Sequence, residues 1–97
     1  MRIEDTMTVE KSIVIKNKQG LHARPAALFV QIANKFSCEI IVSKGRQKVN
    51  GKSIMGIMML EAGSGSKVTI AASGDDAEQA VKELEALLLS DIEEPVL

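Results

Sequence analysis

The sequence predicts an α+β domain with a βαββαβα order, an open-faced two-layer sandwich in which a four-stranded antiparallel sheet carries three helices on one face. The chain has 97 residues, which is enough for one domain. Segments with the two-residue period of a strand alternate with segments of helical period. Short connections then place the helices on the same face. We expect a flexible leader over 1–7, the domain over 8–90 and a C-terminal tail over 91–97.

The first half of the domain predicts a strand, a helix and a hairpin. Ile13 and Ile15 alternate with more polar positions, which favours a strand over 8–16. A helix running to about residue 35 follows, because four apolar residues fall on one of its faces: Ala26, Phe29, Val30 and Ala33. Segments 39–43 and 47–50 are short and rich in β-branched residues, and Gly45 between them favours a hairpin turn.

The second half predicts a short helix, a strand and a long helix. The short helix opens at Ser53, and its Ile57 and Met58 are expected in the core. A strand over 67–72 follows, with Val68, Ile70 and Ala72 on one face. In the last helix, Asp75 and Glu78 have the spacing of a capping box. Its apolar stripe continues to about residue 89 and contains Ala77, Val81, Leu84 and Leu88.

Composition excludes several classes of function. Hydrophobic residues make up 45% and charged residues 26% of the chain, as in ordinary globular domains. The net charge of -1 and the absence of Trp and Tyr argue against a nucleic-acid partner. The single Cys, Cys38, cannot close an intramolecular disulfide, and one Cys with one His is too few for a metal cluster, so neither a metal nor a cofactor is expected. Apolar runs are too short for a membrane span, and the expected location is the cytoplasm.

Charge is nevertheless divided unevenly along the chain. Between residues 11 and 52 there are nine basic residues and one acidic residue, Glu39. From residue 75 to the end there are eight acidic residues and one basic residue, Lys82. The small net charge is therefore a difference between two opposed segments. A basic first half suits an anionic group and acidic partner proteins.

The single histidine, His22, lies in the segment Gly-Leu-His-Ala-Arg-Pro at the start of the first helix. Pro25 is tolerated only in a first turn, which places His22 at or next to the N-cap. The unpaired N–H groups and the positive dipole of a helix start stabilise an anion, and the guanidinium of Arg24 adds a positive charge. Both also disfavour the imidazolium, which leaves a neutral, nucleophilic ring. In an arbitrary protein, such a histidine is more often a surface cap without chemistry.

The segment from Gly20 to Ala26 resembles the phosphohistidine signature of the HPr family, the histidine-containing phosphocarriers of the bacterial phosphoenolpyruvate-dependent phosphotransferase system. The segment from Val49 to Met58, Val-Asn-Gly-Lys-Ser-Ile-Met-Gly-Ile-Met, resembles the family's regulatory-serine segment. The resemblance covers about residues 8 to 90 and implies a phosphocarrier rather than an enzyme. It implies that His22 accepts a phosphoryl group on Nδ1 from enzyme I and passes it to an enzyme IIA domain. Arg24 and the backbone of Ala23 and Arg24 would stabilise the phosphate.

The resemblance also assigns roles within the second segment. Ser53 would be phosphorylated by an HPr kinase/phosphorylase in organisms that have this enzyme, and its hydroxyl also suits the N-cap of the short helix. Ile54 and Met55 would belong to the surface that docks partners beside His22. A short helix cannot bury every face, so some of its apolar residues should be exposed and available to a partner.

Three functional hypotheses stay open at this point. The first is a phosphocarrier acting through His22, and the second is a regulatory module in which Ser53 phosphorylation controls docking to a transcriptional regulator or an enzyme. The third, much less favoured, is a ferredoxin-like domain that binds RNA or a small ligand. The sequence does not indicate a sugar, a choice between the sugar and nitrogen branches, the oligomeric state or the role of the leader.

Overall fold

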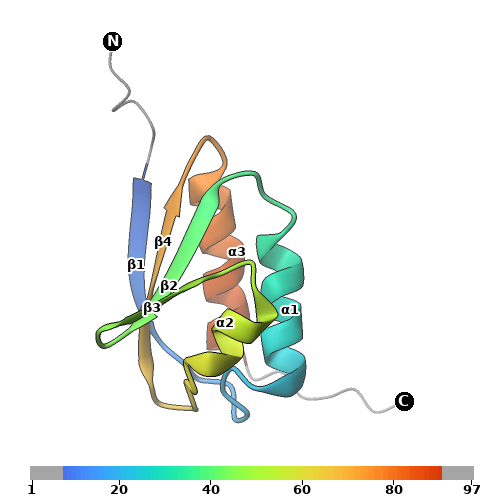
Figure 1. The fold of residues 1–97 in the computed structure, drawn as a ribbon, viewed down its shortest axis with the longest axis vertical. Coiled ribbons are helices and arrows are strands. Elements are labelled where there is room, and N and C mark those ends of the chain that lie inside the picture. The colour runs from blue at the N-terminus through green and yellow to red at the C-terminus, as the bar shows by residue number, and fades with distance from the viewer. Residues whose placement is uncertain (1–7, 91–97) are drawn as a thin grey trace.

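The computed structural model describes residues 8–90; the expected leader over 1–7 and tail over 91–97 lie outside the described residues. Four strands and three helices follow one another in the predicted βαββαβα order (Figure 1). The elements are β1 (Thr8–Val14), α1 (Ala23–Ala33), β2 (Glu39–Lys44), β3 (Gln47–Asn50), α2 (Ile54–Met59), β4 (Lys67–Ser73) and α3 (Ala77–Leu89). The helices lie on one side of the sheet, which confirms the predicted fold class (Figure 1).

The strands form one antiparallel sheet in the order β1-β4-β2-β3. β1 and β2 flank β4, with Val9 opposite Ala72 and Val42 opposite Ile70. β1 ends at Val14, two residues earlier than the alternating pattern predicts. Ile15 stays buried, because its backbone pairs with the loop before β4 instead, at 2.9 Å to Ser66 O and 2.9 Å from Gly65 N.

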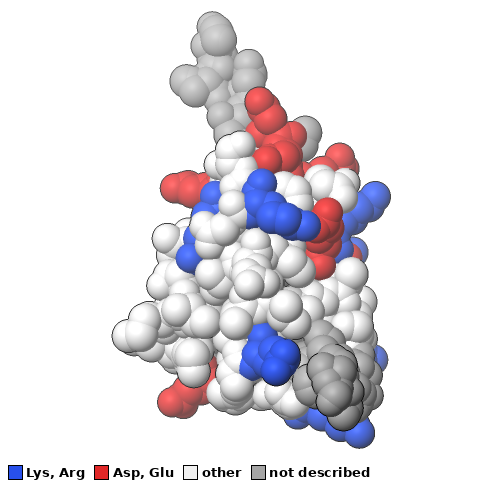
Figure 2. All heavy atoms as spheres, turned by 90° about the vertical axis from the view of Figure 1, so that its right-hand side faces the viewer, with Lys and Arg blue, Asp and Glu red and all other residues white. Residues whose placement is uncertain are grey.

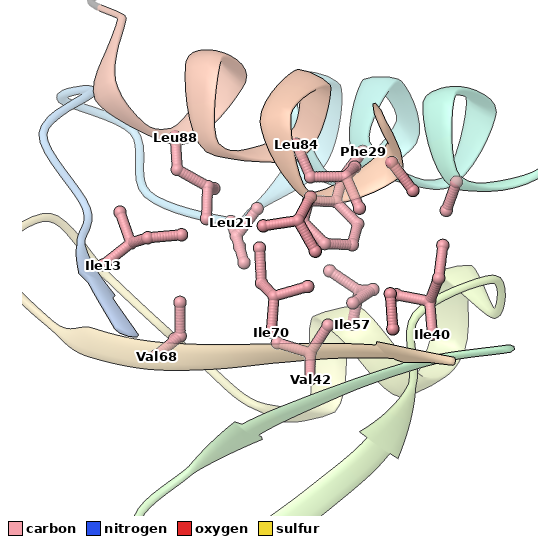
Figure 3. Close-up of a cluster of buried hydrophobic side chains, with 14 of the residues drawn as sticks. Ile13, Leu21, Phe29, Ile40, Val42, Ile57, Val68, Ile70, Leu84 and Leu88 are labelled. Atoms are coloured by element: carbon pink, nitrogen blue, oxygen red, sulfur yellow. The ribbon is translucent and has the colours of Figure 1, made fainter. Parts of the chain in front are cut away.

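The hydrophobic core fills the space between the sheet and the helices. Figure 3 shows Leu84 and Leu88 of α3 and Phe29 of α1 facing side chains that rise from the strands, including Ile13, Ile40, Val68 and Ile70. Ile57 reaches this core from α2, and Leu21 reaches it from the loop before α1. Leu21 is fully buried, so the residue next to His22 anchors this loop in the core.

Two expectations from the sequence are wrong. Met58 is 43% exposed, because α2 turns only the face with Ile57 toward the core. The capping box of Asp75 and Glu78 does not form: the N-cap of α3 is Asp76, and its side chain makes no bond to α3. The Asp76 carboxylate instead accepts bonds from the N–H groups of Ser37 and Cys38 before β2, at 2.9 and 3.0 Å.

No helix within residues 8–90 combines the length and the apolar character that crossing a membrane requires.

The predicted bounds of α1, β2, β3 and α3 agree with the structure within two residues at each end. Both predicted helix starts, at His22 and at Ser53, are also the observed N-caps, which confirms the positions of the two motifs.

Candidate functional site

The start of α1 presents His22 to solvent. His22 is the N-cap, with an extended backbone at φ -121° and ψ 158°, and its side chain makes no capping bond to α1. The first turn contains no acidic residue, and Pro25 brings no N–H group to it. In any helix the first N–H groups have no carbonyl partner one turn earlier, and the first turn of α1 includes Ala23. The imidazole and a positive helix end thus lie side by side.

The His22 ring has one hydrogen-bond partner that defines its orientation. Nδ1 lies 3.0 Å from the carbonyl oxygen of Gln19. A carbonyl oxygen can only accept, so this bond requires the ring proton on Nδ1. The lone pair of the neutral ring is then on Nε2. The resemblance assigns the phosphoryl group to Nδ1, and Nδ1 must leave Gln19 before it can form a bond to phosphorus.

The backbone just after His22 is strained. Ala23 has φ +46°, in the left-handed region that a residue with a side chain adopts at a cost of about 1–2 kcal/mol. The first helical hydrogen bond is correspondingly long, at 3.5 Å from Ala26 N to His22 O. Such strain persists only where surrounding structure enforces it, and it concentrates at functional sites. Here it lies in the residue that directly follows the candidate nucleophile.

The loop before α1 is joined to the loop after α2, which brings the two motif segments together. Leu21 N donates to Ala62 O at 2.8 Å. Gly20 has φ +68°, and a Cβ added to it would lie 2.6 Å from both Ala62 O and Gly63 Cα. Only glycine fits this close approach. The requirement explains the glycine that stands two residues before His22.

Ser53 is the N-cap of α2, as its position predicts. Its Oγ accepts a hydrogen bond from Gly56 N at 3.1 Å. The end of α1 holds the residue before it, because Asn34 Nδ2 donates to Lys52 O at 3.2 Å as well as to Val30 O at 2.9 Å. Ser53 is half-buried, so its hydroxyl is both a structural cap and partly accessible to solvent.

An exposed apolar patch covers α2; we call it the α2 patch and define it as Ile54, Met55, Met58 and Met59. Met55 is the most exposed of the four, at 68%. The β2–β3 hairpin holds the end of this short helix: Lys44 Nζ donates to the carbonyls of Leu60 and Glu61, and Gln47 Nε2 donates to that of Met59. The α2 patch therefore sits on a helix fixed at both ends.

Ion pairs with α3 offset part of the positive charge that the first half of the chain carries. Lys11 pairs with Glu85 at 3.3 Å and Lys35 pairs with Glu83 at 3.0 Å, so α3 neutralises part of it. On the face in Figure 2, most acidic side chains gather in the upper part together with several basic ones, and uncharged surface separates this group from further basic side chains lower down. Exposed basic residues flank His22 in the chain: Lys16, Lys18 and Arg24.

The remaining candidates have structural roles. Cys38 is buried, as expected; burial raises the pKa of its thiol, and the neighbouring Asp76 adds to the rise. The N–H of Ser37 lowers the pKa of the Asp76 carboxyl, with a further contribution from Cys38. Within residues 8–90, no three His, Cys, Asp or Glu side chains are grouped as metal ligands would be.

Comparison with known proteins identifies this arrangement. The family model described as the PTS HPr component phosphorylation site matches residues 9–90. The chain belongs to the HPr family. The HPr-like protein Crh of Halalkalibacterium halodurans is 52% identical over 80 residues, which cover 82% of this chain and 95% of the relative.

Solved structures of HPr-family proteins share the fold. A crystal structure of the phosphocarrier protein HPr from Bacillus anthracis is 51% identical, with a TM-score of 0.82 over 84% of this chain and 96% of that one. A solution structure of Crh, described as the Bacillus subtilis catabolite repression HPr, is 43% identical, with a TM-score of 0.67 over 87% and 100% of the two chains. Membership of the HPr family indicates a phosphocarrier component of the phosphotransferase system rather than an enzyme, and implies interaction with enzymes of that system such as enzyme I and enzyme IIA.

Proposed function

We propose that this HPr-family chain is a phosphocarrier that accepts a phosphoryl group from enzyme I on His22 and passes it to an enzyme IIA domain. The observation that carries the proposal is the exposed imidazole at the N-terminus of α1, whose own side chain makes no capping bond to that helix. Arg24 and the N–H groups of Ala23 and Arg24 stabilise the phosphate. The neutral ring donates an electron pair to phosphorus as the bond from phosphorus to the donor's nitrogen breaks.

Intact-mass analysis after incubation with phosphoenolpyruvate and enzyme I tests this proposal. We expect one phosphoryl group that is labile in acid and stable in base, and its complete loss in His22→Ala. Ser53→Ala is the matched control and should be labelled like the native chain. Persistence of the label in a folded His22→Ala variant would exclude the carrier role of His22.

The α2 patch supplies the docking surface, with Ile54 and Met55 as its principal contacts. These side chains are 41% and 68% exposed and lie on a helix whose following loop is bonded to the loop before His22. Met55→Asp should weaken docking to enzyme I by about tenfold, because a charge replaces an apolar contact at an interface centre. Leu89→Asp is the control, since Leu89 is an exposed apolar residue outside the α2 patch, at the end of α3. Equal effects of the two substitutions on the KM for the carrier would contradict this assignment.

A regulatory role through Ser53 is the second candidate. Two observations favour it: the partly accessible hydroxyl at the start of α2, and similarity to a protein described as catabolite repression HPr. An HPr kinase/phosphorylase would phosphorylate Ser53, and the modified chain would bind a transcriptional regulator. Incubation with the kinase and ATP should add one phosphoryl group that is stable in acid and absent from Ser53→Ala. If label remains in Ser53→Ala, the assignment to Ser53 is wrong.

The two activities can coexist in one cytoplasmic protein, and binding assays separate their contributions. A carrier requires His22 for phosphoryl transfer. A regulatory module requires Ser53 for binding to the regulator and tolerates His22→Ala. Salt-dependent binding to nucleic acid would revive the RNA-binding alternative.

A further inference from the structure

Asn17 differs from every other buried residue in the described part of the chain, because it is the polar member of an otherwise apolar set. Its side chain is 2% exposed. Its amide Nδ2 donates to Gly20 O at 3.0 Å, whereas Oδ1 has no hydrogen-bond partner. Burying an amide with half of its capacity unused is unfavourable. The single bond that the side chain makes, to Gly20 O, therefore indicates what this buried amide does besides packing.

The bond from Asn17 closes the turn that leads to His22. Gly20 N donates back to Asn17 O at 3.2 Å, so these two residues are joined twice. Backbone bonds hold both flanks of the turn, from Lys16 N to Leu88 O at 2.9 Å and from Leu21 N to Ala62 O at 2.8 Å. The doubly bonded turn between these anchors contains Gln19.

Gln19 is the residue whose carbonyl oxygen meets His22 Nδ1, at 3.0 Å. The peptide joining Gln19 to Gly20 carries that oxygen, and the carbonyl of the next peptide is the one that Asn17 holds. Fixing one peptide of a tight turn restricts rotation of its neighbour. The direction of the Gln19 carbonyl thus depends on Asn17 in two ways: its backbone oxygen binds Gly20 N of the same peptide, and its side chain binds Gly20 O of the next peptide.

We propose that Asn17 is a positioning residue for His22, which acts through the Gln19 carbonyl to hold the ring proton of the resting carrier on Nδ1. This inference rests on the proposed function for its significance. Before Nδ1 can take a phosphoryl group, the ring turns away from Gln19 and its proton moves to Nε2 through solvent. The electron pair released on Nδ1 then forms the bond to phosphorus, as the bond from phosphorus to the donor's nitrogen breaks and its electron pair returns to that nitrogen. Asn17 thereby sets how strongly the His22 ring is held in its Nδ1–H form, bonded to the Gln19 carbonyl, before phosphoryl transfer.

Ring ¹⁵N NMR of the unphosphorylated chain tests the proposal, because the two nitrogen signals report which atom carries the proton. At a pH where the ring is neutral, we expect the Nδ1–H form to exceed the Nε2–H form by about 2- to 12-fold, the bias that one net hydrogen bond confers. Asn17→Ser should lower this ratio, because its hydroxyl is one bond too short to reach Gly20 O in the same way and only the backbone bond between the two residues remains. Asn17→Ala is the second variant and should act in the same direction.

Asn34→Ala is the matched control. It also removes amide bonds to backbone carbonyls, but at the opposite end of α1. It should lower stability and leave the His22 ratio unchanged. A predominant Nε2–H form in the native chain would overturn the proposal even if no Asn17 variant folds, as would an unchanged ratio in a folded Asn17→Ser chain. The measurement needs no phosphoryl donor, so failure of the chain to accept a phosphoryl group would overturn the proposed function alone.

Discussion

α1 and α2 begin in opposite ways, although each carries one of the two sequence motifs at its start. At α2 the N-cap side chain fills its own helix end, since Ser53 Oγ accepts from Gly56 N. At α1 the N-cap side chain turns away, since the His22 ring contacts Gln19 O and makes no capping bond. A filled end contributes stability, whereas an open end retains its capacity to stabilise an incoming anion.

The open end depends on its surroundings for its geometry. Ala23 is strained at φ +46°, and nothing in the His22 side chain stabilises the helix start. The loop bonds at Gly20 and Leu21 supply the restraint instead. We therefore expect substitutions near α1 to affect stability through that loop, and substitutions at the start of α2 to affect it through the cap itself.

The largest effect is expected from Gly20→Ala. The new Cβ would lie 2.6 Å from Ala62 O while φ stays at +68°, so steric overlap and left-handed strain both contribute. Together they should lower the free energy of unfolding by about 3 kcal/mol, measured by urea denaturation. Gly45→Ala is the control: Gly45 has φ +61° and nothing within 4 Å, so only strain of about 1–2 kcal/mol applies. Equal losses in the two variants would show that the contact with the loop after α2 contributes nothing.

Removing the N-cap side chain should lower the free energy of unfolding more at α2 than at α1. Ser53→Ala removes the bond to Gly56 N and should lower the free energy of unfolding by about 1 kcal/mol. His22→Ala removes an exposed side chain without a capping bond and should change it by less than about 0.5 kcal/mol. Urea denaturation of both variants measures the difference. A larger loss for His22→Ala than for Ser53→Ala would reverse the proposed division between an open and a filled helix start.

Most of the fold and the position of both motifs could be predicted from the sequence, because they depend on local signals. Pro25 and the apolar spacing after it locate the start of α1, and Ser53 before a helical pattern locates the start of α2. The contacts that complete the site could not be predicted in this way. Asn17 becomes buried, and Lys44 reaches the end of α2, only after segments that are distant in the sequence have packed together. The exposure of Met58 could not be predicted either, because sequence spacing does not show how narrow the buried face of a short helix is.

A smaller effect should follow from loosening the other end of α2. Lys44 Nζ donates to the carbonyls of Leu60 and Glu61 at 3.0 and 3.1 Å. Lys44→Met keeps most of the aliphatic stem and removes both bonds, which should cost about 0.5–1 kcal/mol and speed amide exchange in α2. Lys48→Met is the control, because Lys48 lies on the same hairpin with an exposed side chain. Identical amide exchange in the two variants would contradict a role for Lys44 in holding the α2 patch.

The smallest effect concerns the start of α3, a third kind of helix start in which the N-cap side chain serves another segment. The Ser37 N–H, with help from Cys38, lowers the pKa of the Asp76 carboxyl from its ordinary value of 3.8. A lowered folded-state pKa means that this carboxylate stabilises the fold above about pH 4 and loses its contribution as pH falls through the lowered value.

Asp76→Asn should therefore be less stable than the native chain at pH 7 and should lose less stability between pH 5 and pH 2. The amide can accept one of the two bonds and carries no charge to be protonated. Urea denaturation across this pH range measures both effects, with Asp75→Asn as the control because Asp75 is the exposed neighbour in the chain. Superimposable pH profiles for the two variants would mean that the bonds to Ser37 and Cys38 add nothing to the fold. Separate profiles would show that the capping residue of α3 contributes by holding the start of β2.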